Sequence, residues 1–351
     1  MKVKIEIWSP YPPPYGGVSV HSMRLYKKLK YKYNILFKNF SKSPYSSDLA
    51  VKYVKWPLFE LIEYIFIPKK IVHLHYNIVY LWFIMLFYPR STKIILTLHN
   101  QYTVQNLSFI KEIIVRLFFK KVNRIFVNDE AFANQLSLKY SLKDKIIINP
   151  AFIEPLPEEM ELLPEEILEF RKNHKYIISS LAWKLYKMND IDVYGIEHIV
   201  EAFSLVRKCN QNVGLLLLIP IIGDFSHYNK IIEIITLNRI SDSVLIYNKS
   251  IKNGFDIWKL SDIFLRSTIT DSEGISIKEA LFFGTKVIAT DIVERPQGVD
   301  LYKYGDVEGL KITIERNLNS IKSTLNNENL QQGIFQIDKI YKELTENMYE
   351  I

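Results

Sequence analysis

Short apolar runs rich in β-branched residues alternate with longer stretches of helical periodicity along the whole chain. In the first half the strand candidates are residues 3–8, 70–75, 93–99 and 124–129. In the second half they are residues 176–181, 214–220, 243–248, 262–267 and 286–291. Strands that alternate with helices are typical of βαβ units and a mostly parallel sheet. The pattern therefore predicts two doubly wound α/β domains.

Proline and glutamate separate the two sets of strands. Four prolines and six glutamates fall between residues 150 and 166, and such a stretch is typical of a linker. Residues 335–350 carry apolar side chains at helical spacing, which predicts an amphipathic helix that needs an apolar surface to cover. We therefore predict an N-terminal domain of residues 1–155, a C-terminal domain of residues 156–332 and a terminal helix within residues 333–351.

Charge divides unequally between these parts. The formal net charge is +7, but residues 1–155 carry 23 basic and 9 acidic side chains, whereas residues 156–351 carry 22 and 29. A basic domain favours an anionic partner, and no nucleic-acid-binding motif accompanies it, so we expect no nucleic acid. The single cysteine, Cys209, excludes a disulfide framework and a cysteine-rich metal site, and fits a reducing compartment.

Two segments bear on membrane contact. The start of the chain lacks the apolar core of a signal peptide, and the longest apolar run, residues 78–88, is too short to span a bilayer. Residues 108–124 interleave basic with apolar side chains, as a helix on an anionic membrane surface does. A core helix with a solvated basic edge explains this segment equally well. We expect a cytoplasmic protein. Whether it also contacts the cytoplasmic face of a membrane stays open at this point.

Glycine is scarce, and the only two within the first 194 residues are adjacent, Gly16 and Gly17. They follow a predicted strand and precede a predicted helix. Glycines there let backbone N–H groups approach an anionic ligand at a helix N-terminus. The alternative is a tight strand-to-helix turn. The spacing is not that of the dinucleotide-binding fingerprint.

A second motif, residues 270–291, combines a polar loop, a short helix, Gly284 and an apolar strand. Glu279 is expected one turn into the helix, eight residues after Asp271, with Glu273 between them. Carboxylates accept hydrogen bonds from sugar hydroxyls, and free N–H groups at a helix start hold phosphate. Here these N–H groups belong to Gly274, Ile275, Ser276 and Ile277. The alternative is a helix start whose acidic residues complement its dipole.

Four groups of residues together resemble glycosyltransferase family 4, of the GT-B fold, across nearly the whole chain. The first is Asp271, Glu279–Ala280, Gly284 and Val287–Asp291. The others are Gly16, Gly17 and His21; Thr97 and His99; and Tyr194, Gly195 and Glu201–Phe203.

The resemblance implies two Rossmann-like parallel-sheet domains that face each other across a cleft, with the terminal helix packed back on the first. It implies a retaining transferase that binds a UDP- or GDP-sugar donor on the second domain and the acceptor on the first. Asp271 would contact donor-sugar hydroxyls and Glu279 the nucleotide ribose. His99 would lie beside the reacting sugar and the Gly16–Gly17 loop near the diphosphate. No cofactor and no metal ion are expected.

The sequence departs from the family at the cations that neutralise the diphosphate. Many relatives have an arginine after the first strand of the second domain and a lysine before the turn glycine. Here Ser180, Leu181 and Tyr194 occupy these places. Lys184, Lys187 or Arg266 would have to supply the charge. The first acidic position is Asp271 rather than a glutamate, and Glu273 adds another carboxylate, so the identity of the donor sugar stays open.

Two further patterns allow a metal site. Asp190 and Asp192 match the Asp-x-Asp signature of metal-dependent glycosyltransferases, but they precede a helix, which favours a capping or solvated role. His73 and His75 alternate on one strand face without a cysteine or carboxylate at metal-ligand spacing. A packing or loop-lining role is favoured for both histidines.

The predicted function is therefore transfer of a sugar from a nucleotide-sugar to a hydroxyl of a glycan or lipid-linked acceptor, in the biosynthesis of a surface polysaccharide or glycoconjugate. A basic acceptor domain suits a phosphorylated lipid at a membrane. Two alternatives stay open. One is a sugar-nucleotide epimerase of the same fold, and the other is a catalytically silent nucleotide-sugar-binding subunit.

Overall fold

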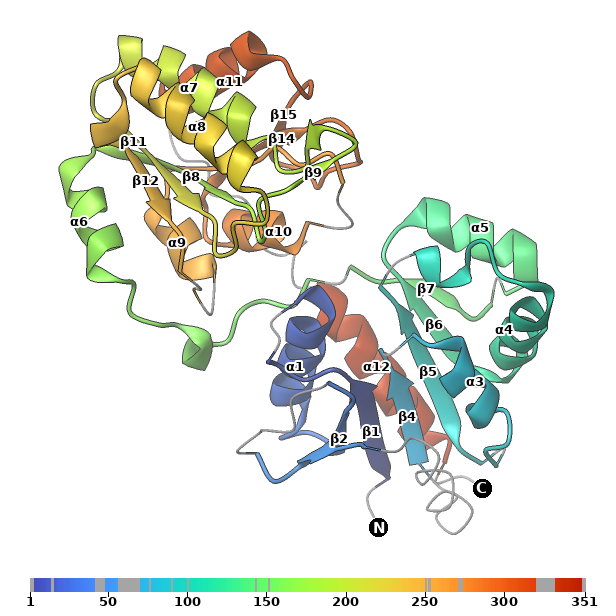
Figure 1. Ribbon diagram of the computed structural model, residues 1–351. Coiled ribbons are helices and arrows are strands. Elements are labelled where there is room, and N and C mark those ends of the chain that lie inside the picture. The colour runs from blue at the N-terminus through green and yellow to red at the C-terminus, as the bar shows by residue number, and fades with distance from the viewer. Residues whose placement is uncertain are drawn as a thin grey trace. The chain divides into compact units, whose positions relative to one another are not determined.

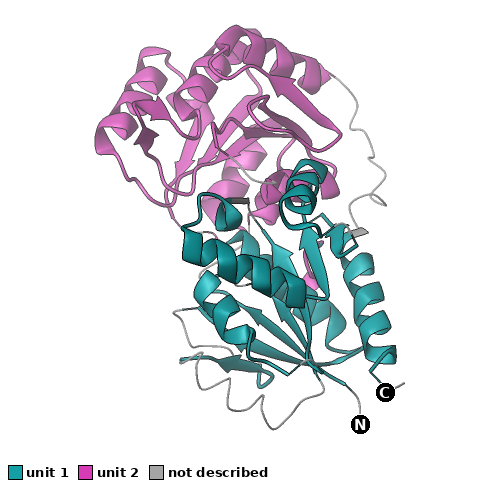
Figure 2. Cartoon of the chain, turned by 90° about the vertical axis from the view of Figure 1, so that its right-hand side faces the viewer, with its two compact units in different colours: residues 1–153, 328–351 teal, residues 154–327 magenta. Residues whose placement is uncertain are grey.

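The computed structural model describes residues 3–13, 16–41, 48–55, 70–75, 77–89, 91–99, 101–142, 144–150, 152–249, 251, 254–270, 274–319 and 332–348. The chain divides into two compact units (Figure 2). Unit 1 comprises Met1–Ile153 and Glu328–Ile351, and unit 2 comprises Glu154–Asn327.

Unit 1 is built on a seven-stranded parallel sheet with the strand order β3-β2-β1-β4-β5-β6-β7. The strands are β1 (Lys4–Ser9), β2 (Asn34–Asn39), β3 (Val51–Tyr53), β4 (Lys70–Leu74), β5 (Lys93–Leu98), β6 (Arg124–Val127) and β7 (Ile146–Ile148). β1, β4, β5 and β6 coincide with the four predicted runs. The prediction missed β2, because Lys38 and Asn39 interrupt its apolar pattern, and the three-residue strands β3 and β7 at the sheet edges.

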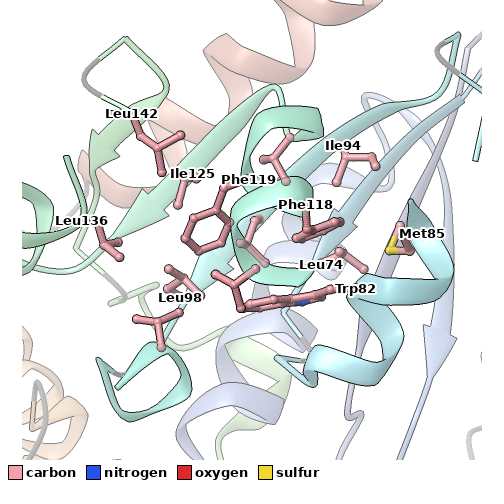
Figure 3. Packing of buried hydrophobic residues seen from close by; sticks show 14 of the residues in the cluster. Leu74, Trp82, Met85, Ile94, Leu98, Phe118, Phe119, Ile125, Leu136 and Leu142 are labelled. Carbon is pink, nitrogen blue, oxygen red and sulfur yellow. The ribbon is translucent and has the colours of Figure 1, made fainter. Parts of the chain in front are cut away.

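Helices cover both faces of this sheet (Figure 1). α1 (Gly17–Leu29) and α12 (Gln332–Glu346) pack on the face that carries Ile5 and Ile7 of β1. α3 (Val79–Met85), α4 (Phe109–Lys121) and α5 (Glu130–Tyr140) pack on the opposite face, which carries Trp8. The division follows from the alternation of side chains along a strand. Figure 3 shows the second core, in which Trp82 of α3 stacks on Phe118 of α4 with ring centroids 5.2 Å apart.

The C-terminal helix α12 belongs to unit 1. Its apolar residues lie buried in the same cluster as α1 and β1: Ile337, Ile340, Tyr341 and Leu344, with Met348 beyond its end. Asp338 accepts hydrogen bonds from Lys32 and from the Tyr33 hydroxyl, the latter at 2.8 Å, and Glu343 pairs with Arg124. The apolar stripe at helical spacing thus covers the sheet face next to α1.

Unit 2 has a six-stranded parallel sheet with the order β12-β11-β8-β13-β14-β15. The strands are β8 (Tyr176–Leu181), β11 (Val213–Leu218), β12 (Val244–Tyr247), β13 (Ile263–Arg266), β14 (Lys286–Thr290) and β15 (Val299–Tyr302). All five predicted strands are present, and the prediction missed only the partly exposed edge strand β15 of this sheet. A small antiparallel pair, β9 (Lys187–Met188) and β10 (Ile191–Asp192), lies between β8 and the next helix.

The helices of unit 2 lie on both sides of its sheet. α7 (Ile196–Cys209), α8 (Phe225–Leu237) and α11 (Val307–Asn319) bury their apolar residues with Leu215, Leu217 and Leu265. The other helices are α6 (Glu165–Asn173), α9 (Phe255–Leu260) and α10 (Ile275–Phe282). Trp258 of α9 lies on Phe264, whose side chain points to the face opposite that of Leu265. Short 3-10 turns occur at η1 (Gln101–Val104), η2 (Pro157–Glu159) and η3 (Ser241–Ser243).

Candidate active site

Each sheet has one position at which the order of the strands reverses. In unit 1 it lies between β1 and β4, and in unit 2 it lies between β8 and β13. In open parallel sheets, ligands bind beyond the carboxyl ends of the strands at this position. Each unit therefore has one place where a ligand is expected.

Motif residues of unit 1 lie at this place. Gly16 lies in the connection from β1 to α1, and His21 lies one turn into α1. His75 directly follows β4, and His99 directly follows β5. Because parallel strands present their carboxyl ends at one edge, residues from three separate parts of the sequence meet at the reversal point.

The conformation of Gly16 does not explain why a glycine stands there. Its φ of −158° and ψ of 166° are extended values that any residue adopts. A Cβ atom at Gly16 would have its nearest neighbour, the Ser19 hydroxyl oxygen, 4.0 Å away. The same oxygen accepts a hydrogen bond from the Gly16 N–H at 3.0 Å. Neither backbone strain nor packing within the described residues requires this glycine, which weakens the tight-turn alternative.

Three histidines form a cluster at the site. The His75 Nδ1 and His99 Nε2 atoms are 3.0 Å apart, within hydrogen-bond distance. The His21 ring lies 5.3 Å from that of His75 and 5.0 Å from that of His99, between centroids. Their nitrogen atoms lie within 4.8 Å of one another, which is close enough for the three to bind one divalent metal ion. His21 and His75 are buried, whereas His99 is partly exposed.

Burial keeps three histidines of this region, His73, His75 and His99, uncharged. Removal of the imidazole rings from water lowers the pKa of His73, His75 and His99 well below the usual value, and nearby histidines lower the pKa further. Near pH 7 these three side chains are therefore neutral, and each ring has one N–H donor and one acceptor nitrogen.

These lowered pKa values predict that the fold loses stability in mild acid. The unfolded chain binds protons at these histidines below about pH 6.5, whereas the folded chain resists protonation. The free energy of unfolding should therefore fall between pH 7.5 and 5.5, by up to about 1.4 kcal/mol per pH unit for each histidine. Urea unfolding at the two pH values measures the change, and His73→Gln should flatten the slope. Equal stability at both pH values would contradict the neutral assignment.

The hydrogen bonds also assign the proton positions. His75 Nε2 is buried and has no hydrogen-bond partner among the described residues. Buried N–H groups without an acceptor are rarer in proteins than acceptors that lack a donor. We therefore assign the proton of His75 to Nδ1, which then donates to Nε2 of His99. Neutral His99 must accordingly carry its own proton on Nδ1, as a donor for a ligand.

His73 has a structural role. Its Nδ1 lies 2.8 Å from the Tyr341 hydroxyl of α12, and its Nε2 lies 2.8 Å from the Thr97 hydroxyl of β5. Both ring nitrogens are thus used to join α12 to the sheet, as the packing role predicted for this residue requires. His75, for which the same role was predicted, is also buried, and it contacts His99 directly as well.

In unit 2 the expected place lies at the start of α10. Gly274 precedes the helix with a φ of 59°, a left-handed conformation that favours glycine. Glu279 lies on the second turn of α10 and is 8% exposed. The N–H groups of Gly274, Ile275, Ser276 and Ile277 were predicted to hold phosphate. The Ile277 N–H donates to the Gly274 carbonyl at 2.8 Å, so the candidates are the N–H groups of the other three residues. Asp271 and Glu273 lie outside the described residues.

The three candidate cations of unit 2 have different surroundings. Lys187 pairs with Glu197, with 3.2 Å between the Nζ and Oε1 atoms. Arg266 ends β13, at the reversal point, and its guanidinium lies 5.7 Å from the centre of the Tyr194 ring. Lys184 is exposed, and its side chain packs so closely on Gly223 that a Cβ there would lie 2.4 Å from the lysine Cε. Lys184, which is exposed, therefore presents its charge more readily than Lys187.

Asp192 caps a helix. Its carboxylate accepts hydrogen bonds from the N–H groups of Tyr194 at 3.0 Å and Glu197 at 3.1 Å, and His227 Nε2 lies 3.3 Å away. Burial alone would raise the pKa of Asp192, but the contact with His227 and the two N–H donors outweigh it and lower that pKa. Asp190 is exposed. The sequence favoured a capping or solvated role for Asp190 and Asp192, and the structure shows the capping role for Asp192.

Comparison with known structures identifies the fold. A glycosyltransferase from Rickettsia africae is 16% identical, with a TM-score of 0.70 and 99% of each chain covered. Anabaena Alr3699/HepE in complex with UDP is 13% identical, with a TM-score of 0.68 and full coverage of both chains. Sucrose-phosphate synthase from Thermosynechococcus elongatus is 12% identical, with a TM-score of 0.65, 98% of this chain and 99% of that one covered.

The fold is GT-B. The predicted pair of doubly wound parallel-sheet units is thereby confirmed. No protein-family model matches the sequence, and no curated protein matches it.

Within this GT-B chain, the sequence prediction overlooked the link between His75 and His99. A signal was present, since both residues directly follow predicted strands. The order of the strands in the sheet was required to show that these two strands, β4 and β5, are neighbours.

Proposed function

We propose that the protein is a retaining glycosyltransferase of family 4 that transfers a sugar from a UDP- or GDP-sugar to a hydroxyl group of an acceptor. The observation that carries the proposal is the place of five motif residues at the strand-order reversals: Gly16, His21 and His99 in unit 1, and Gly274 and Glu279 in unit 2. Anabaena Alr3699/HepE has the same fold and was crystallised with UDP and with UDP-glucose. These structures support a nucleotide-sugar as the donor.

The donor is assigned to unit 2. Glu279 accepts hydrogen bonds from the ribose hydroxyls, and Asp271 accepts them from hydroxyls of the sugar. N–H groups of Gly274, Ile275 and Ser276, at the positive end of α10, favour the diphosphate. Lys184 supplies positive charge, with Arg266 as a second candidate, and Lys187 does so only if it leaves Glu197.

The acceptor is assigned to unit 1, together with two groups that act on the donor. At the Gly16–Gly17 connection the Gly16 N–H donates to the Ser19 hydroxyl oxygen, so the Gly17 N–H is the group proposed to face the diphosphate. His99 donates a hydrogen bond from Nδ1 to the reacting sugar. We propose same-face transfer: the acceptor oxygen bonds to the anomeric carbon, the bond from that carbon to the diphosphate breaks, and the diphosphate takes the acceptor proton. This scheme needs no metal ion, although the three histidines could bind one.

The acceptor is proposed to be a glycan or lipid-linked sugar used in surface polysaccharide or glycoconjugate synthesis. The excess of basic over acidic side chains in residues 1–155, 23 against 9, suits a phosphorylated lipid at the cytoplasmic face of a membrane.

Ligand binding tests the donor assignment. A thermal-shift panel of UDP, GDP, UDP-glucose, UDP-N-acetylglucosamine and GDP-mannose should show a rise in Tm with one base, because a ligand that binds only the folded state stabilises it. Glu279→Gln should weaken binding of that nucleotide roughly 10- to 100-fold, as expected for loss of a charged hydrogen bond. Asp271→Asn should lower sugar transfer and leave binding of the free nucleotide unchanged.

The exposed residue Glu233 of α8 offers a matched control, and Glu233→Gln should bind and transfer as the wild type does. Transfer should persist in EDTA. If no nucleotide raises the Tm, a silent subunit replaces the proposal. If incubation without acceptor yields a new sugar nucleotide, an epimerase replaces it.

A further inference from the structure

The α3–α4 surface of unit 1 exposes large apolar side chains on two adjacent helices. On α3, Tyr80 is 50%, Phe83 is 46% and, just beyond its end, Phe87 is 70% exposed. On α4 the exposed apolar residues are Phe109, Ile110, Ile113 and Leu117. Single exposed apolar residues are ordinary, but a group of seven marks an interaction site.

Helical spacing places these residues on one side of each helix. Phe109, Ile113 and Leu117 follow one another four residues apart, so they line one stripe of α4. Val115, Phe118 and Phe119 of the same helix are buried and fill the core below. On α3, Tyr80, Phe83 and Phe87 recur at intervals of three and four residues, while Trp82 turns inward (Figure 3).

The two exposed faces adjoin each other. α3 and α4 lie side by side on the same face of the sheet (Figure 1). The Lys121 ammonium group of α4 donates hydrogen bonds to the carbonyl groups of Leu86, at 2.7 Å, and Tyr88, at the end of α3. On the helix, Lys121 lies next to the side that carries Leu117, so this contact brings Phe87 beside the apolar stripe of α4.

Basic residues lie among the apolar ones. Arg116 and Lys120 are exposed on α4, and each lies three residues after a member of the apolar stripe, Ile113 and Leu117 respectively. The one acidic residue of this helix, Glu112, contacts Lys139 and Tyr140 of α5, at 2.9 and 3.2 Å, and also pairs with Arg116, at 3.7 Å. The surface is therefore both apolar and positively charged.

We propose that the α3–α4 surface binds an anionic phospholipid membrane. Lysine is depleted in the cores of protein–protein interfaces, whereas helices that lie on anionic membranes combine lysine and arginine with phenylalanine and leucine. The net positive charge of residues 1–155 attracts the protein to an anionic membrane. No helix within the described ranges is long and apolar enough to cross a membrane.

Sedimentation with vesicles tests the proposal on the full chain, without donor or acceptor. Binding to vesicles of phosphatidylglycerol and phosphatidylcholine should exceed binding to pure phosphatidylcholine at least tenfold and should fall with salt. The triple variant Phe87→Ser, Phe109→Ser, Ile113→Ser should lose at least tenfold in affinity. Arg116→Gln with Lys120→Gln should lose severalfold in affinity, and only for the anionic vesicles.

Matched controls distinguish binding through the α3–α4 surface from non-specific hydrophobic binding. Tyr31, Leu138 and Phe335 are equally exposed apolar residues elsewhere on unit 1, and changing these three to serine should leave binding unchanged. Lys52→Gln with Lys55→Gln controls for net charge. Unchanged binding by the α3–α4 variants, or no preference for anionic vesicles, would overturn the proposal. Because nucleotide binding is measured separately on the same variants, a failure here leaves the transferase proposal intact.

Discussion

His99→Ala is expected to lower kcat for sugar transfer roughly 100- to 1,000-fold, the loss that follows removal of a preorganised hydrogen-bond donor from an active site. His99 directly follows β5, at the edge where the strand order reverses, and His75 holds its Nε2 atom at 3.0 Å. The orientation of the ring and the position of its proton are thus set before a substrate binds. Steady-state kinetics with the donor found in the thermal-shift panel measures the effect.

A buried histidine of unit 2 provides the control for this variant. His174 is 8% exposed, and its Nδ1 lies 2.9 Å from the Phe170 carbonyl oxygen. His174→Gln should leave kcat unchanged. If His99→Ala keeps more than a third of the wild-type kcat at unchanged stability, His99 does not contact the reacting sugar.

His75 is expected to act as a positioning residue for His99. In His75→Gln the amide N–H can still donate toward His99 Nε2, so most of the activity should remain. His75→Phe has no donor, and kcat should fall at least tenfold with little change in KM. Nitrogen-15 NMR of the His99 ring should show the proton on Nδ1 in the wild type and a mixture of tautomers in His75→Phe. A proton on Nε2 in the wild type would reverse the assignment.

Glu6→Gln is expected to cost about 3–5 kcal/mol of the free energy of unfolding, the usual range for breaking a buried ion pair. Glu6 lies in the centre of β1 and is fully buried. The ammonium groups of Lys38 and Lys70 lie 3.4 and 3.5 Å from its carboxylate, and the side chains of these lysines are 2% and 0% exposed. The Trp8 indole N–H also donates to this carboxylate, at 3.0 Å.

Glutamine preserves the size of the side chain but removes the negative charge between two buried positive charges. A loss of this size should lower the Tm by roughly 6–20 °C. Thermal and urea unfolding measure it. Asp144→Asn, at an exposed carboxylate of the same unit, should change stability by less than about 0.5 kcal/mol.

A second substitution tests the cause. Adding Lys38→Met to Glu6→Gln removes one of the two buried ammonium groups, so the double variant should regain part of the lost stability. If Glu6→Gln costs less than about 1 kcal/mol, the carboxylate does not balance these lysines in the folded protein.

The sequence determined the main strands and the positions of the motifs, because both depend on local properties. Alternation of apolar runs with helical periodicity requires only neighbouring residues, and it predicted four strands of unit 1 and five of unit 2. Neighbouring residues also predicted the position of Gly16–Gly17 at the start of α1 and that of Glu279 on α10. The prediction missed four strands, β2, β3, β7 and β15. Short or edge strands, and strands with buried polar residues such as Lys38, lack this pattern.

The tertiary structure decided which of these local features act together. His75 and His99 are 24 residues apart in sequence, and they meet only because β4 and β5 are neighbours in the sheet. Helical periodicity left residues 108–124 equally suited to the core and to a membrane. The packing of α4 buried Val115, Phe118 and Phe119 and left Phe109, Ile113 and Leu117 exposed. Which side of a helix meets the core depends on the elements around it, and the sequence pattern of that helix does not contain this information.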